Sequence, residues 1–147
     1  MDVSNLKFMF RHIHPKGSVE PEHTHPHREL IYYIRGEGKV VIAGKEYSYR
    51  GGSYAYIPVG VPHIEKHDTQ TEVLFFVFEL DNDFITLREG VFHDDGGELL
   101  PLFEELQREI VQKRKYYDYA ANGLIQRIVI QISRRQFPET DESVLRE

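Results

Sequence analysis

Short apolar runs separated by glycine and proline occupy the chain from Leu6 to Glu79. The runs are rich in Val, Ile, Tyr and Phe, and the breaks between them recur roughly every ten residues, which is typical of strands in a sandwich or barrel. The segment 40–49 predicts a hairpin whose turn contains Gly44. The run EVLFFVFEL, residues 72–80, is apolar in both parities and predicts a strand buried between two layers.

The pattern changes after HDDGG at residues 93–97, where two adjacent glycines predict a hinge. Two amphipathic stripes follow, in which apolar residues recur at the three- and four-residue spacings of a helix. They comprise Leu99, Leu102, Phe103, Leu106 and Ile110, then Tyr117, Ala120, Ala121, Leu124, Ile125, Ile128, Val129 and Ile132. We expect a helical hairpin that begins near Glu98 and ends before Pro138, and whose stripes pack on the barrel or on a second copy of the chain.

The composition limits the classes of protein that the chain can belong to. A length of 147 residues suits one domain with a real core, and the formal net charge of -6 leaves little to attract nucleic acid. There is no cysteine, so any metal must be held by imidazole and oxygen. The chain lacks a secretory signal pattern and an apolar run of the roughly 20 residues that a membrane helix needs. We therefore expect a soluble, cytoplasmic protein without a membrane partner.

The histidines are unevenly distributed, because the stretch HTHPHRE at residues 23–29 contains three of the eight in the chain. In an extended strand His23, His25 and Glu29 would point the same way, since side chains alternate with period two. His63 lies beyond a Pro-Val-Gly turn in a separate segment and offers a fourth donor. Three neutral imidazoles and one carboxylate suit a divalent transition metal, namely Zn, Ni, Mn, Fe, Co or Cu.

The two segments resemble the conserved motifs of the cupin superfamily at every spacing. The first motif runs from Gly17 to Gly36 through the two histidines and Glu29, and the second runs from Gly52 through Pro58 and Gly60 to His63. The family usually has Asn four residues after the last histidine, and this chain has His67 there. The resemblance implies a mainly β fold, a cupin barrel (double-stranded β-helix or jelly roll) open at one end, followed here by the two-helix hairpin.

The same resemblance implies that His23, His25, Glu29 and His63 hold the metal inside the barrel. The alternative is that the histidines serve as hydrogen-bonding groups for a sugar or an acid. Four further side chains are candidate ligand-binding residues that would line the cavity, although aromatic core packing would explain the tyrosines equally well. They are Tyr33, Tyr54, Tyr56 and His67. We interpret the pair in RHIHP, His12 and His14, as structural, and we place His27 in a loop at the barrel rim.

Residues 15–135 are also similar to the sensor half of AraC-type transcription regulators, which share the order of histidine-rich entry, IPVGVPH segment and two helices. The resemblance implies that residues 1–95 form an effector- and metal-binding barrel and that residues 96–137 form a dimerisation hairpin. Residues 138–147 would then link to a DNA-binding domain absent from this chain. The expected partners are a small polar effector, a sugar or organic acid, and a second copy of the chain.

On this interpretation the chain is not an enzyme and has no catalytic residue. The alternative is a stand-alone metal-dependent cupin enzyme, an isomerase, dioxygenase or decarboxylase, with a tyrosine or Glu65 as the acid–base group. Glu65 shares the parity of His63, but a rim position facing water would fit it as well. A small interaction barrel without a ligand is a third possibility.

Overall fold

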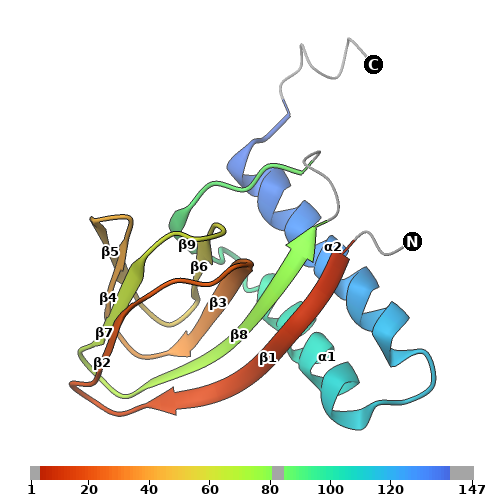
Figure 1. The fold of residues 1–147 in the computed structure, drawn as a ribbon, viewed down its shortest axis with the longest axis horizontal. Coiled ribbons are helices and arrows are strands. Elements are labelled where there is room, and N and C mark those ends of the chain that lie inside the picture. Colours follow the sequence, from red (N-terminus) through yellow and green to blue (C-terminus); the bar gives the residue numbers. More distant parts are fainter. Residues whose placement is uncertain (1–3, 81–84, 140–147) are drawn as a thin grey trace.

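The computed structural model describes residues 4–80 and 85–139, and the chain folds into a two-sheet barrel followed by two helices (Figure 1). Residues 140–147, which hold most of the expected linker, lie outside the described part. The strands are β1 (Ser4–His14), β2 (Val19–His23), β3 (Arg28–Arg35), β4 (Gly38–Ile42), β5 (Lys45–Tyr49), β6 (Ser53–Ile57), β7 (His63–His67), β8 (Thr71–Leu80) and β9 (Gly90–His93). The helices are α1 (Leu99–Gln112) and α2 (Tyr117–Gln136).

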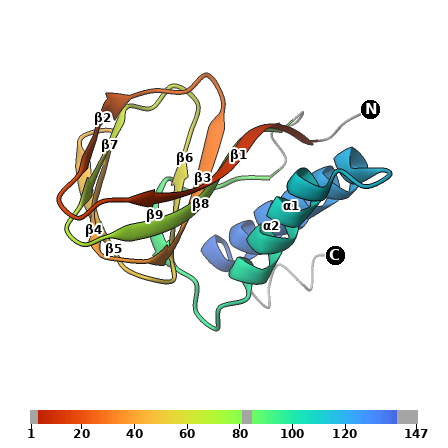
Figure 2. The ribbon, with the colours of Figure 1, turned by 90° about the horizontal axis from the view of Figure 1, so that it is seen from below.

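The strands form two antiparallel sheets that face each other. The larger has the order β1-β8-β3-β6-β9 and the smaller the order β2-β7-β4-β5. The helices lie against the outer face of the larger sheet, so the molecule has three layers (Figure 2). The predicted fold class, a mainly β cupin-like barrel followed by a two-helix hairpin, is confirmed. Among the described residues, no helix is long and apolar enough to cross a membrane.

The predicted hairpin and the predicted start and end of the helical segment are present in the structure. The hairpin of β4 and β5 turns at Ala43 and Gly44, both at positive φ, which matches the strongly twisted two-residue turn of antiparallel hairpins. Pro101 lies in the first turn of α1, where its missing N–H is not needed. The last turn of α2 precedes Pro138, as the sequence predicts.

The central strands of the larger sheet, β8, β3 and β6, are buried on both faces, and alternate residues of these strands therefore belong to two different cores. On β8, Leu74, Phe76 and Phe78 pack against the helices, whereas Val73 faces the interior between the sheets. This arrangement explains why the run 72–80 is apolar in both parities.

The apolar stripe of α2 packs inside the monomer. Leu124 is 9% exposed, and Ile125, Ile128, Val129 and Ile132 are fully buried against α1 and the larger sheet. Of the two expected locations of the stripe, the structure therefore selects the barrel. A dimer contact, if it uses the helices, must use other side chains.

The segment after β9 is firmly held, although its glycine pair predicted a hinge. The carboxylate of Asp94 is buried and accepts hydrogen bonds from the Tyr32 hydroxyl (2.7 Å) and the Leu99 backbone N–H (3.1 Å). It also forms an ion pair with Arg135 of α2 at 2.7 Å. One side chain thus ties β3, the start of α1 and the end of α2 together.

The end of α2 has further contacts to the chain that precedes β9. The Gln136 side chain accepts a hydrogen bond from the Arg88 N–H (2.7 Å) and donates one to the Arg88 carbonyl (3.3 Å). The Ser133 hydroxyl donates to the Thr86 carbonyl at 2.8 Å. The last turn of the helix is therefore attached to the barrel by side chains as well as by packing.

Replacing Ile128 by alanine should lower the free energy of unfolding by about 2–5 kcal/mol, because it removes a fully buried side chain and leaves a cavity. Val59→Ala is the matched control, since Val59 is 56% exposed and its loss should change stability by less than about 0.5 kcal/mol. Chemical denaturation followed by circular dichroism measures both. Equal stabilities of the two variants would contradict the monomeric packing of the stripe.

Candidate metal centre

The four predicted metal ligands converge at one end of the barrel interior. His23 ends β2, His25 lies in the connection between β2 and β3, Glu29 is on β3, and His63 begins β7. One donor atom from each lies within 4.8 Å of one from every other member. The set is therefore assembled from both sheets.

The geometric reason for this convergence differs from the predicted one. We expected His23, His25 and Glu29 to share a face of one strand, but residues 24–27 are irregular and carry the chain from the smaller sheet to the larger. His23 is paired with His63 across β2 and β7. Glu29 approaches the same point from the opposite sheet, which is why the set closes around a centre.

The separations suit a metal ion. Two donors that each lie about 2.1 Å from a tetrahedral metal are about 3.4 Å apart. The Glu29 Oε1 atom is 3.2 Å from His63 Nε2 and 3.5 Å from His25 Nε2. The fourth donor, from His23, lies within 4.8 Å of the other three.

Hydrogen bonds to backbone carbonyls determine which ring nitrogens face the centre. His23 Nδ1 contacts the Pro21 carbonyl at 2.9 Å, and His63 Nδ1 contacts the Val61 carbonyl at 3.2 Å. A carbonyl only accepts hydrogen bonds, so each Nδ1 carries the hydrogen and the neutral ring keeps a lone pair on Nε2. Metal-binding histidines are oriented by outer partners of this kind.

The Glu29 carboxylate is unsatisfied without a cation. Glu29 is 5% exposed, and its Oε1 accepts no well-directed hydrogen bond from the described residues, although His63 Nε2 is near. A neutral His63 presents a lone pair to this oxygen, so two acceptors face each other. A proton on His63 or a bound metal cation would remove the repulsion. The donor set therefore fits a divalent metal.

The pKa values of the two most enclosed imidazoles shift in opposite directions. Burial lowers the pKa of His63, but the carboxylate of Glu29 beside it outweighs this effect and raises the pKa above the usual value. Burial lowers the pKa of His25, and the neighbouring histidines lower it further, against the opposing effect of Glu29. His25 is thus the ring that stays neutral and able to bind a metal to lower pH.

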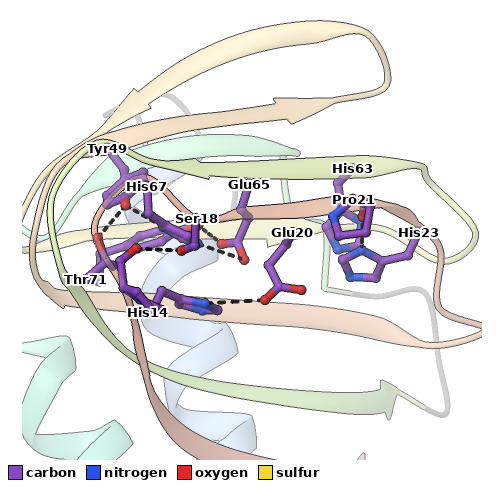
Figure 3. Close-up of polar contacts among 12 residues, drawn as sticks. His14, Ser18, Glu20, Pro21, His23, Tyr49, His63, Glu65, His67 and Thr71 are labelled. Carbon is purple, nitrogen blue, oxygen red and sulfur yellow. Dashed lines mark hydrogen bonds and ion pairs between the residues drawn. The ribbon is translucent and has the colours of Figure 1, made fainter.

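A cavity of about 380 Å³ adjoins the candidate metal centre, within the size range of small-molecule sites. Its apolar walls include Phe8, Phe10, Ile31, Val73 and Phe75. Its polar lining includes the side chains of His14, Glu20, His25, Glu29 and Glu65. In Figure 3, His23 and His63 lie toward one end of this interior, while Tyr49, His67 and Thr71 lie toward the other.

Two of the four predicted ligand-binding residues face this interior. The Tyr33 hydroxyl donates a short hydrogen bond to Glu65 Oε1, and the His67 ring stacks on His14 with centroids 4.1 Å apart. Tyr33 and His67 therefore contact residues that line the cavity.

The other two, Tyr54 and Tyr56, lie on the opposite face of β6. They pack in the core between the larger sheet and the helices, and Ala55 and Ile57 take the inward positions. Strand alternation shows that two tyrosines share a face, but it leaves open which face is the inner one. Their predicted place in the cavity wall is corrected accordingly.

The structure places two further side chains in the interior, namely His14, which the sequence did not single out, and Glu65, whose position the sequence left open. His14 is 6% exposed and lines the cavity, although the RHIHP segment was interpreted as structural. Glu65, a possible rim residue, is buried between the sheets, and this burial raises its pKa to about 7. His27 does lie near the rim, where Nδ1 is 2.8 Å from Glu79.

The family comparison supports this description of the barrel. Residues 9–79, just under half of the chain, match the family model described as "Cupin domain". This match, together with the two antiparallel sheets, supports the cupin superfamily. No curated protein matches the chain at the significance threshold.

Solved structures with similar folds come from several proteins. A conserved protein of unknown function from Streptococcus pyogenes is 19% identical, with 53% of this chain and 68% of that chain covered and a TM-score of 0.49. An RmlC-like cupin from Shewanella frigidimarina is 22% identical, covering 55% and 72%, with a TM-score of 0.48. An oxalate decarboxylase from Bacillus subtilis is 23% identical, covering 54% and 22%, with a TM-score of 0.47.

Adding Zn²⁺ or Ni²⁺ to chelator-treated protein should raise its melting temperature, because the ion binds the folded state. At a metal concentration 100 times the Kd, the stabilisation is about 2.7 kcal/mol per site. His25→Ala removes one of four ligands and should reduce both the shift and the metal retained after gel filtration.

His27→Ala is the control, because it removes a neighbouring imidazole that is ion-paired with Glu79 instead. It should retain the wild-type shift and metal content. Elemental analysis and thermal unfolding provide the measurements, and equal metal retention by His25→Ala and wild type would contradict the assignment of the centre.

Proposed function

We propose that the chain is the ligand-sensing and dimerisation domain of an AraC-type transcription regulator. The barrel would bind a small polar effector, a sugar or organic acid, beside a divalent transition metal held by His23, His25, Glu29 and His63. Contact with DNA would belong to a separate domain. The observation that carries the proposal is that one strand, β3, contacts the cavity with one face and the helices with the other.

The alternation along β3 provides a physical route between the two regions. Glu29 and Ile31 line the cavity, whereas Leu30 and Tyr32 pack in the core shared with the helices. A shift of β3 that accompanies ligand binding would alter both faces, because the backbone is common to them. An effector can shift the equilibrium only by its difference in affinity for the two arrangements.

The Asp94 contacts would pass such a shift to the ends of both helices. Tyr32 donates to Asp94 from β3, and Asp94 in turn accepts from the first residue of α1 and pairs with Arg135 near the end of α2. A displacement of Tyr32 would disturb a buried carboxylate that holds both helices. The cost of leaving such a group unpaired makes this contact sensitive to small movements.

The cavity favours a small polar ligand with some apolar surface. Hydroxyl and carboxylate oxygens of such a ligand suit a divalent metal, and the bound metal would supply Lewis-acid attraction for them. The phenylalanine side chains of the wall, of which Phe8 and Phe10 are 37% and 58% exposed, would accept the carbon skeleton of the ligand. Glu65 and His14 offer hydrogen-bonding partners at a distance from the candidate metal centre.

Dimerisation would use helical side chains that the monomer leaves exposed. Val111, Tyr116 and Tyr119 are between 65% and 73% exposed and gather where α1 turns into α2. They could pack against the same residues of a second copy. The buried stripe of α2 would then act only as internal support.

A metal-dependent enzyme is the second candidate, and Glu65 is the observation that favours it. A buried carboxyl group with a pKa of about 7 is suited to proton transfer near neutral pH. The Tyr33 hydroxyl donates to Glu65 Oε1 and so orients the carboxyl group. This hydrogen bond does not use the other oxygen, Oε2. A sensor would release the bound molecule chemically unchanged, whereas an enzyme would convert it to a product.

Isothermal titration of the metal-loaded protein with a panel of pentoses, hexoses and dicarboxylic acids separates these candidates. The sensor proposal expects at least one compound to bind, with the compound recovered chemically unchanged after long incubation, as followed by NMR. Turnover of the bound compound would support the enzyme, and the absence of binding across the panel would count against both.

Replacing Tyr32 by phenylalanine should uncouple the cavity from the helices. In wild type, Ni²⁺ binding should slow amide hydrogen exchange in β3 and at the start of α1. In Tyr32→Phe, Ni²⁺ affinity should stay within about twofold, a difference of about 0.4 kcal/mol, while the response of α1 is lost because the hydroxyl no longer holds Asp94.

Tyr56→Phe is the matched control, since Tyr56 lies on the same outer face but its hydroxyl accepts from Arg28. It should preserve the response of α1. An unchanged response in Tyr32→Phe would mean that the route through Asp94 is wrong.

A further inference from the structure

His14, Glu65 and His67 form a second cluster of potential metal ligands inside the barrel. Their donor atoms lie within 4.8 Å of one another, and all three side chains are buried. His14 comes from β1 of the larger sheet, while Glu65 and His67 come from β7 of the smaller one. As in the candidate metal centre, both sheets contribute, and Figure 3 places this cluster away from His23 and His63.

We propose that His14, Glu65 and His67 bind a second divalent metal ion, so that the barrel holds two ions per chain. The inference concerns side chains outside the candidate metal centre and is independent of the proposed regulator role. It depends on three observations about the cluster, namely a directed chain of hydrogen bonds, a buried lone pair without a partner, and an outer partner for each ligand.

A directed chain of hydrogen bonds determines the protonation of His67. The Thr71 hydroxyl donates to the Thr69 carbonyl at 3.1 Å, so its oxygen is free to accept from the Tyr49 hydroxyl at 2.6 Å. The Tyr49 oxygen then accepts from His67 Nδ1 at 2.6 Å. The hydrogen of the neutral ring is therefore on Nδ1, and Nε2 keeps its lone pair.

That lone pair is buried and unsatisfied. His67 is 1% exposed, and its Nε2 has no hydrogen-bond partner among the described residues. The nearest charged atom is Glu65 Oε2, 4.0 Å away, which is itself an acceptor when ionised. Two acceptors thus face each other, as Glu29 and His63 do at the candidate metal centre.

Each of the three ligands is held from behind by an outer partner. Tyr49 holds His67, the Tyr33 hydroxyl holds Glu65 through Oε1, and Glu20 lies 3.4 Å from His14 Nδ1 (Figure 3). The contact with Glu20 leaves His14 Nε2 for another partner. Outer contacts that orient ligand atoms and leave the inner atoms free are characteristic of metal sites.

The donor atoms would have to draw closer to bind one ion. Ligand atoms of a tetrahedral ion are about 3.4 Å apart. His67 Nε2 is 4.0 Å from Glu65 Oε2, and the donor atoms of all three residues lie within 4.8 Å of one another. Glu20, which lines the same cavity, is available to balance the charge.

Metal stoichiometry tests the proposal directly. Chelator-treated protein is titrated with Co²⁺, followed by its visible absorption, and with Zn²⁺, followed by calorimetry and elemental analysis. Wild type should saturate at two ions per chain. His14→Gln and His67→Gln should each saturate at one, and His14→Gln combined with His25→Ala should bind none.

His27→Ala is the matched control, because it removes an imidazole that is ion-paired with Glu79 and belongs to neither cluster of potential ligands. It should still bind two ions. Circular dichroism checks that each variant folds, and His14→Gln decides the matter if the fully enclosed position 67 does not tolerate glutamine.

The outcomes distinguish the two sites. Saturation of wild type at one ion that is lost in His25→Ala but kept in His14→Gln would overturn the second site and leave the first. One ion lost in His14→Gln but kept in His25→Ala would support the second site and overturn the first. Two ions in both wild type and His14→Gln would also contradict the proposed ligands.

Discussion

The larger sheet is buried on both faces along its central strands, β8, β3 and β6, and the rest of the structure depends on this constraint. Its outer face is covered by α1 and α2, and its inner face closes against the smaller sheet. Polar groups can remain on the inner face only if something compensates for their loss of water. The barrel meets this requirement with directed hydrogen bonds and, where two acceptors face each other, with a donor set that fits a cation.

Much of the site could be predicted from the sequence, because the intervals between the candidate ligands are visible in the sequence itself. The intervals that join His23, His25, Glu29 and His63 identified the residues that converge, even though the predicted continuous strand does not exist. The burial of β8 on both faces was likewise predicted, since the run 72–80 is apolar in both parities.

What could not be predicted depends on contacts between distant segments. His14 was assigned no chemical role because its partner, His67, lies on another sheet, and nothing in RHIHP indicates that β1 borders the cavity. The same limit applies to Tyr54 and Tyr56, whose shared face is visible in the sequence while the identity of that face is not. The sequence likewise left open whether the apolar stripe of α2 packs on the barrel or on a second copy of the chain. Its burial against the larger sheet answers this question.

The contacts at the end of α2 affect how the helix can move. Terminal turns of helices usually fray, because their last carbonyls lack partners within the helix. Here Ser133, Arg135 and Gln136 anchor that turn to segments preceding and following β9. The end of α2 is therefore fixed relative to the barrel. A rotation of the larger sheet would move this end of the helix together with the segments around β9.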